Sequence, residues 1–221
     1  LLLDIVPFEL TEAEQKKGLT KEDKAVRNRI ATESLAKLVK ASPALLYKKE
    51  FAERISVGNF DDDLQKIKNT DWIIEVVVER LDIKKSVYEK IEQFRKPGAL
   101  VSSNTSGIPI NMLVEGRSAD FKHYFAGTHF FNPVRYLPLL EIIPTKDTDA
   151  EIVKFYMEYG AKFLGKTTVL AKDTPAFIAN RIGVFSIMNL LHNVKSIGLN
   201  VTEVDKLTGP VIGRPKSATF R

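Results

Sequence analysis

The chain has 221 residues, a formal net charge of +5, and 44% hydrophobic and 28% charged residues, a composition that fits one sizeable globular domain or one domain and part of a second. It contains no cysteine, which excludes disulfides, thiolate metal sites and cysteine nucleophiles, and with three histidines we expect no metal centre. No apolar run approaches the roughly 20 residues that span a membrane. The mild positive charge is not gathered in blocks interleaved with aromatics, which argues against nucleic acid and slightly favours a small anionic ligand.

The chain opens on an apolar segment, residues 1–6, which predicts a buried parallel strand with Asp4 near its carboxyl end. Dinucleotide-binding folds use an acid at such a position to bind ribose hydroxyls, about 20 residues after a G-x-G-x-x-G turn. None of the 12 glycines forms that pattern. Asp4 is therefore either a turn cap or a ribose-binding acid, and in the second case we expect the first strand, glycine turn and helix of the fold to be missing from this sequence.

Strands and helices alternate through most of the chain. The strands are predicted at 54–57, 72–78, 100–103, 124–131, 137–143 and 167–171. The helices are predicted at 21–40, which is long and basic, and at 61–68, 82–94 and 149–163. This βαβ rhythm predicts an α/β protein with a Rossmann-like doubly wound sheet and right-handed crossovers.

The pattern changes at KDTP, residues 172–175, where Asp or Thr as N-cap and Pro at the first helical position predict a helix start. The helix that follows, to about residue 196, is apolar on most faces, which predicts that it is buried within a domain or against another subunit. Its Asn180 then needs a buried partner. We expect a sheet domain over 1–171 and the beginning of an all-helical domain over 172–221.

Two polar clusters fall at the carboxyl ends of predicted strands, where open α/β sheets bind their ligands. Glu75, Glu79 and Lys84 lie in or just after the strand WIIEVVV, and Glu79 taken alone is better explained as a helix cap. The segment SNTSG, residues 103–107, offers short hydroxyl and amide side chains that either bond a ligand or cap the next helix. Taken singly, neither cluster decides between ligand binding and capping.

A third cluster lies in GTHFFNPVRYLPLLE, residues 127–141, where His129 stands in a Phe-rich run and Glu141 in another apolar run. A single histidine beside aromatics is more often a satisfied core residue. A histidine next to a carboxylate in a partly dry pocket is, however, a general-base arrangement. The two residues are the candidate proton-transfer pair if the fold brings them together.

The strings SSNTSG, GTHFFNPV, LLEII, KDTPAFIANRIG and TGPVIGRPKS, in this order and spacing, resemble the L-3-hydroxyacyl-CoA dehydrogenase family over nearly the whole chain. The resemblance implies a Rossmann-like NAD-binding domain that lacks its first βα unit here, joined to part of a helical domain that forms a homodimer. It implies NAD-dependent oxidation of (S)-3-hydroxyacyl-CoA to 3-oxoacyl-CoA in fatty-acid β-oxidation. We accordingly expect an acyl-CoA substrate, neither nucleic acid nor membrane as a partner, and a cytoplasmic location.

The resemblance also assigns roles to residues. His129 is the catalytic base that takes the hydroxyl proton, and Glu141 orients the imidazole and stabilises the imidazolium, as the carboxylate does in a Ser-His-Asp triad. The remaining expected contacts are Ser106 and Asn180 on the substrate oxygen, Asn104 near the nicotinamide, Asp4 on the ribose, Glu79 and Lys84 in the cofactor cleft, and the basic helix 21–40 beside the CoA nucleotide.

The chain departs from the family pattern in two places, and other functions stay open. Without the glycine turn we expect the 221 residues alone to bind NAD poorly. Ala176 stands where the family usually has Gly, a change expected to cost little. The alternatives are a non-catalytic CoA-ester-binding or assembly fragment, part of a larger bifunctional hydratase/dehydrogenase, and a dehydrogenase that acts on a free hydroxy acid.

Overall fold

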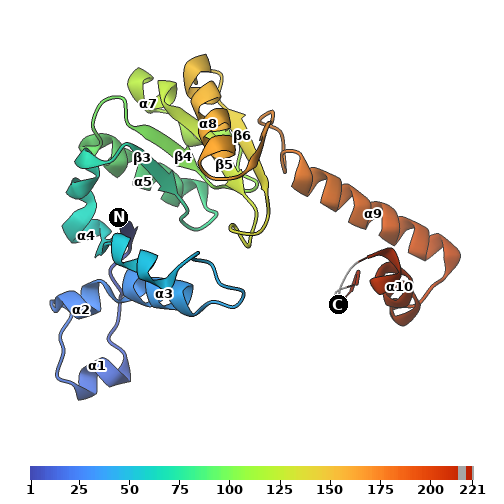
Figure 1. Cartoon of the computed structure of the whole chain (residues 1–221), viewed down its shortest axis with the longest axis horizontal. Helices are drawn as coiled ribbons and strands as arrows, with labels where there is room; N and C mark the ends of the chain where they lie inside the picture. Colours follow the sequence, from blue (N-terminus) through green and yellow to red (C-terminus); the bar gives the residue numbers. More distant parts are fainter. Residues whose placement is uncertain (214–217, 221) are drawn as a thin grey trace. The chain divides into compact units, whose positions relative to one another are not determined.

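The computed structural model describes residues 1–213 and 218–220 (Figure 1). The chain divides into two compact units, residues 1–173 and 174–221. The Rossmann-like α/β class predicted from the sequence is confirmed, and the described strands all lie in the first unit. The end of the motif TGPVIGRPKS, residues 214–217, lies outside the described residues.

The described strands form two sheets rather than the single sheet that the sequence predicts. A parallel pair joins β1 (Leu2–Asp4) to β2 (Val57–Asn59), with Asp4 opposite Asn59. The second sheet has five strands in chain order: β3 (Trp72–Glu75), β4 (Leu100–Ser103), β5 (Phe125–Phe130), β6 (Leu139–Pro144) and β7 (Thr167–Leu170). Within residues 1–213 and 218–220, β1 pairs only with β2, and β3 pairs only with β4. The predicted burial of the first strand is therefore wrong: β1 is half-exposed, since its second edge has no partner there.

Strand direction in the larger sheet follows from the connections. The strands β3, β4 and β5 are parallel. The helices that return the chain between them are α5 (Leu81–Phe94), α6 (Ile110–Leu113) and α7 (Ala119–His123). Residues 131–138 join β5 to β6 without a helix, so these two strands are antiparallel, which the doubly wound prediction did not include. Helix α8 (Ala150–Lys162) then crosses back, and β7 is parallel to β6.

Helices cover both faces of the five-stranded sheet. Helix α8 contacts β6 and β7 on one face. The buried cluster there consists of Leu100, Ala126, Leu140, Ile142 and Tyr156. On the other face the rings of Tyr88 in α5, Phe121 in α7 and Phe125 in β5 lie with centroids 5.3 to 5.8 Å apart. Because side chains alternate along a strand, His129 lies on the face of Phe125, the face that α5 and α7 cover.

Several predicted elements differ from those observed. The predicted helix 21–40 is divided into α2 (Lys24–Arg27) and α3 (Arg29–Lys40) at Asn28, whose Oδ1 accepts a hydrogen bond from the buried Asn59 Nδ2 at 2.7 Å. The predicted strand 72–78 stops at Glu75 because the Glu75 side chain accepts the Val77 N–H at 2.6 Å and takes it out of the strand ladder. The remaining short elements are α1 (Glu12–Lys16), η1 (Lys49–Arg54), α4 (Phe60–Asp63) and η2 (Leu64–Asn69).

The KDTP segment does not start a helix. The carboxylate of Asp173 instead accepts hydrogen bonds from the Ile110 and Asn111 backbone N–H groups at 2.7 and 2.9 Å, so it caps α6. The chain then passes through positive φ angles of 62° and 47° at Ala176 and Phe177 before α9 begins. The positive φ at Ala176 argues against the expectation that this change costs little, because φ near +60° favours glycine over alanine.

The second unit contains α9 (Ala179–Ile197), α10 (Val201–Thr208) and η3 (Pro210–Ile212). Helix α10 begins with a capping box between Asn200 and Glu203. No residue of α9 is buried in the described chain, so the predicted burial within a domain is not found there, and burial against another subunit stays a prediction. Asn180 is the second residue of α9 and is half-buried.

Candidate functional site

The five-stranded sheet brings together the histidine and the glutamate that the sequence singles out. Because β5 and β6 are antiparallel, His129 and Glu141 are direct cross-strand partners. The distance from His129 Nδ1 to Glu141 Oε2 is 2.7 Å, and the two residues are 5% and 0% exposed. A carboxylate accepts hydrogen bonds, so this contact favours the imidazole tautomer that carries its proton on Nδ1. In that tautomer Nε2 is the basic nitrogen.

Close packing holds this face of β5 in position. Gly127 lies two residues before His129 on the same face, and a Cβ there would approach the Ile110 side chain to 2.8 Å. Ile110 begins α6, the helix that Asp173 caps. The glycine of the GTHFF motif is thus required for the approach of α6. Sequence spacing alone does not reveal the role of Asp173, since it caps a helix about 60 residues earlier in the chain.

Asn104 lies beside the strand that carries the histidine. Its Oδ1 accepts the backbone N–H of Phe130, the residue after His129, at 2.9 Å. Its own backbone N–H donates to the Glu75 carbonyl at 2.9 Å. The Asn104 side chain therefore substitutes for a strand carbonyl just past the end of β4. Its role near the nicotinamide stays a prediction, as do those of the other expected contacts.

Glu79 binds the loop that follows β4. Its Oε1 accepts the Ser106 and Gly107 backbone N–H groups at 3.0 and 3.1 Å and also the Thr105 hydroxyl. Burial acts to raise the pKa of Glu79, but the Thr105 hydroxyl, the Lys84 cation and the Ser106 N–H outweigh it, and the pKa lies below its usual value. Glu79 is therefore an ionised cap of this loop, and its side chain is 42% exposed.

Lys84 is buried, with a side chain that is 1% exposed. Its Nζ contacts Glu75 Oε1 at 2.8 Å, the Val77 carbonyl at 3.2 Å and Glu79 Oε2 at 3.3 Å. An ammonium group has three donors, and these three acceptors match them. The ammonium group of Lys84 thus remains within the protein, and its place in a cofactor cleft stays a prediction.

Ser106 and Asp4 are more accessible than these residues. Ser106 is exposed, and in the described part of the chain its hydroxyl has no hydrogen-bond partner. Asp4 is half-exposed at the end of β1 and accepts the Ile5 backbone N–H at 2.8 Å. Both are accessible to solvent, and their contacts with a ligand stay predictions. Asn180 belongs to the second unit, and its contact with the substrate oxygen stays a prediction.

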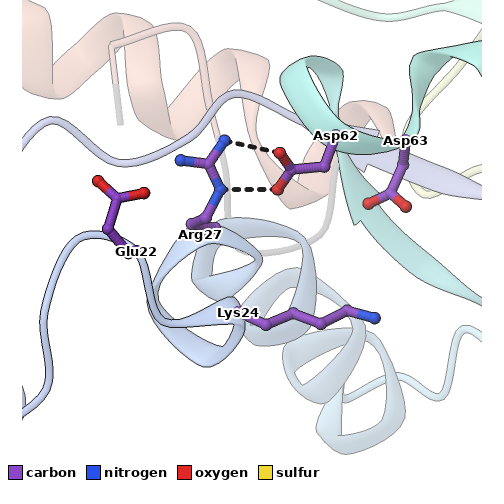
Figure 2. A pocket seen from close by; sticks show the side chains of 5 residues that line it. All are labelled: Glu22, Lys24, Arg27, Asp62 and Asp63. Carbon is purple, nitrogen blue, oxygen red and sulfur yellow. Dashed lines mark hydrogen bonds and ion pairs between the residues drawn. The ribbon is translucent and has the colours of Figure 1, made fainter.

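A pocket of about 470 Å³ lies away from the His129–Glu141 pair, between the start of α2 and α4 (Figure 2). Five charged side chains line it: Glu22, Lys24, Arg27, Asp62 and Asp63. Arg27 donates to both carboxylate oxygens of Asp62, at 2.6 and 2.8 Å, which neutralises its charge. With three acids against two bases, the pocket does not suit a phosphate group, although it lies on the basic segment predicted to adjoin the CoA nucleotide.

Three contributors to the site were missed in the sequence: the buried Tyr88, the buried Ser103 as a donor to Glu75, and the partly buried backbone N–H of Phe130. One pattern could have revealed Tyr88, because it follows Lys84 by four residues and so shares its helix face. No sequence pattern reveals the role of the Phe130 backbone N–H, because any residue other than proline at that position would supply the same group.

The five-stranded sheet has polar side chains at the ends of its parallel strands. This arrangement is typical of Rossmann-like α/β nucleotide-binding domains. The profile of the 3-hydroxyacyl-CoA dehydrogenase NAD-binding domain matches residues 8–174. The chain belongs to that family, which confirms the resemblance predicted from the sequence, and NAD is the cofactor of the matched domain.

Similar proteins agree with this assignment. A protein named probable 3-hydroxyacyl-CoA dehydrogenase from Bacillus subtilis is 54% identical over all of this chain and 28% of its own length. One with the same name from Deinococcus radiodurans is 48% identical over 90% of this chain and 58% of its own length. The crystal structure of FadB2 from M. tuberculosis matches with 27% identity and a TM-score of 0.69, over 87% of this chain and 66% of that one. The chain thus spans between about a quarter and three fifths of the two curated relatives.

Two features are absent from residues 1–213 and 218–220. None of the helices there combines the length and apolar character that a membrane crossing needs. The same residues contain no group of three or more His, Asp or Glu side chains arranged to hold a metal ion.

Proposed function

We propose that the natural polypeptide containing this chain is an NAD-dependent (S)-3-hydroxyacyl-CoA dehydrogenase that forms 3-oxoacyl-CoA, within fatty-acid β-oxidation. The observation that carries the proposal is the buried His129–Glu141 pair, with 2.7 Å between Nδ1 and Oε2. The family of the chain supports the reaction class.

In the proposed mechanism His129 Nε2 accepts the proton of the substrate 3-hydroxyl as the C3–H bond breaks and the C3–O bond becomes a carbonyl. NAD supplies the acceptor for the hydride that leaves C3. Glu141 stabilises the imidazolium that forms and keeps the ring in one tautomer. Base catalysis of this kind contributes about 10²–10⁴-fold to the rate.

The residues present fit part of the cofactor. Half-exposed Asp4 at the end of β1 suits ribose hydroxyls, and Asn104 at the end of β4 suits an amide-bearing ring beside His129. Lys84 and Glu79 would shape the cleft wall between them. The pyrophosphate has no G-x-G-x-x-G turn in this sequence. We propose Ser106 and Asn180 for the substrate oxygen, since both offer polar side chains that are not fully buried.

Acyl-CoA as substrate, a homodimer through the helical unit and a cytoplasmic location remain part of the proposal. The exposed apolar side chains of α9, such as Ile182, Phe185 and Met188, support an additional protein contact for that helix. Sedimentation of the natural polypeptide tests the dimer, and a monomer at micromolar concentration would contradict it.

The reaction is tested by following NADH consumption with acetoacetyl-CoA, in the natural polypeptide and in its His129→Ala variant. We expect turnover in the first and a loss of at least about a hundredfold in the second. A His123→Ala variant is the matched control, because that histidine is half-exposed and lies on α7. Equal turnover of all three proteins would exclude the dyad.

The assay also separates the alternatives. A non-catalytic CoA-ester-binding or assembly role, within a larger bifunctional hydratase/dehydrogenase, gives acyl-CoA binding without NADH consumption. A dehydrogenase of free hydroxy acids consumes NADH with acetoacetate in place of acetoacetyl-CoA. The chain covers only 28% of the Bacillus subtilis relative, which leaves room in such a relative for further regions.

A further inference from the structure

We propose that Glu75 is a positioning residue for the base: its buried carboxylate fixes the loop after β4, residues 103–107, and through Asn104 the strand that carries His129. The inference deepens the proposed function, on which its effect on turnover rests. Neither Glu75 nor its partners would touch the substrate.

Glu75 joins three elements at the carboxyl edge of the sheet. Its side chain is fully buried and accepts four hydrogen bonds. The donors are the Val77 N–H at 2.6 Å, Lys84 Nζ at 2.8 Å, Tyr88 Oη at 2.5 Å and Ser103 Oγ at 2.6 Å. These donors come from the β3–α5 connection, from α5 and from β4, so one carboxylate ties the three together.

The hydrogen bonds of the Glu75 side chain require a carboxylate and no other group. A buried carboxylate is costly unless it is paired, and Lys84 supplies the counter-charge. Burial and then the negative charge of Glu75 raise the pKa of Tyr88 well above its ordinary value, so its hydroxyl remains a donor. An amide in place of the carboxylate would turn one acceptor oxygen into a donor that faces other donors.

The junction continues into the loop that approaches the base. The Asn104 N–H donates to the Glu75 carbonyl at 2.9 Å, and the Thr105 N–H donates to Ser103 Oγ at 3.2 Å. The Asn104 amide thus ends on the backbone carbonyl of Glu75, and the Thr105 amide connects to the Glu75 carboxylate through the Ser103 hydroxyl, so the carboxylate holds the residues on both sides of Asn104. Asn104 Oδ1 then accepts the Phe130 N–H, which adjoins His129. The hydrogen-bonded path from Glu75 to the strand of the base is continuous.

If the Glu75 cluster only stabilised the fold, its loss would lower stability without a specific effect on His129. Loss of any fully buried hydroxyl lowers stability if its partner is left unsatisfied. Only the positioning role predicts that the imidazole of His129 also changes its environment. A matched comparison is available, because Tyr156 is another fully buried tyrosine whose hydroxyl donates to a carbonyl, that of Val101 at 3.3 Å. Tyr156 packs on the opposite face of the sheet from His129.

The first arm of the test is histidine-ring NMR on the natural polypeptide, with His129 assigned through its His129→Gln variant. We expect Ser103→Ala and Tyr88→Phe to displace the His129 ring signals by more than a line width, while Tyr156→Phe leaves them in place. Unmoved His129 signals in both Ser103→Ala and Tyr88→Phe would overturn the inference. This arm needs no turnover, so it decides the positioning role even where the proposed reaction fails.

The second arm is a double-mutant cycle in kcat with Glu75→Gln and Asn104→Ala. Misplacement of the reacting groups is expected to lower kcat by about tenfold to a hundredfold in each single variant, with less change in KM for the acyl-CoA. If Glu75 acts through Asn104, the double variant is no slower than the slower single one. A loss of kcat in the double variant that equals the product of the two single losses would contradict the inference. A wild-type protein without turnover would reject the proposed function, and the NMR measurement alone would then decide the positioning role.

Discussion

The two sheets of the first unit contain the same kinds of residue in very different surroundings. In the five-stranded sheet, polar side chains of β3 to β6 are buried and matched donor to acceptor, as in the 2.7 Å contact of His129 with Glu141. Beside the two-stranded sheet, the ion pair of Arg27 with Asp62 is partly exposed. Burial makes geometry rigid and charge interactions strong, whereas solvent weakens both. The proposed reacting groups His129 and Glu141 are thus held by buried contacts, whereas β1, which we propose to face the cofactor, pairs with one strand among the described residues.

The largest expected effect concerns two histidine–carboxylate pairs. Glu141→Gln should lower turnover of the natural polypeptide by at least about a hundredfold, because the imidazolium loses its buried counter-charge. Steady-state NADH consumption measures this.

The control is Asp149→Asn, which alters the pair of His123 Nε2 and Asp149 Oδ2 at 3.6 Å, where both side chains are more than a third exposed. Asparagine still caps α8, so the fold is retained and turnover should not change. Similar losses in the two variants would mean that burial of the pair does not matter.

The second prediction concerns NAD. We expect the 221-residue chain to bind it with a dissociation constant of about 1 mM or weaker, since the sequence has no glycine turn for the pyrophosphate. Isothermal calorimetry measures this. A micromolar constant would contradict it, and Asp4→Asn would then show whether β1 contributes to that binding.

The third prediction concerns the segment after Asp173. Ala176→Gly should raise the free energy of unfolding by about 0.5–1 kcal/mol, because relief of the positive φ outweighs the greater chain entropy of glycine when unfolded. Urea unfolding followed by circular dichroism measures it. Ala179→Gly, at the first position of α9, is the matched control and should lower stability. Equal changes in the free energy of unfolding in the two variants would show that the positive φ at Ala176 carries no energetic cost.

The sequence predicts the parts of this molecule that depend on local pattern. The helix at 82–94 and the strand at 100–103 are found at or within one residue of their predicted bounds, because each has a consistent period and clear end signals. His129 and Glu141 could be paired in advance only as candidates. Their contact depends on the reversal at residues 131–138, which makes β5 and β6 antiparallel.

Errors arose where a distant contact outweighs a local preference. Asp173 has the sequence of a helix cap for its own segment, yet it caps α6, where two backbone N–H groups need an acceptor. Glu75 similarly ends β3, because its carboxylate, which also accepts hydrogen bonds from α5 and β4, accepts the Val77 N–H. Such choices depend on which polar groups the folded chain buries together, and no short window of sequence contains that information.

The smallest expected effect concerns the partly exposed Arg27–Asp62 ion pair beside the two-stranded sheet, and it is the dependence of its stabilising effect on pH. Hydrogen bonds from Arg27 and then Asn59 lower the pKa of Asp62 from 3.8 to about 2. A lowered pKa in the folded state means that the carboxylate stabilises the fold above the unfolded value and loses this effect as the pH falls through the folded one. The stability difference between wild type and Asp62→Asn should therefore be constant at neutral pH, shrink between pH 3.8 and about 2, and vanish below. Asp61→Asn, 3.9 Å from Arg27 and more exposed, should show less of this dependence in urea titrations across that range. A difference that persists undiminished below pH 2 would mean that Asp62 acts through packing rather than charge.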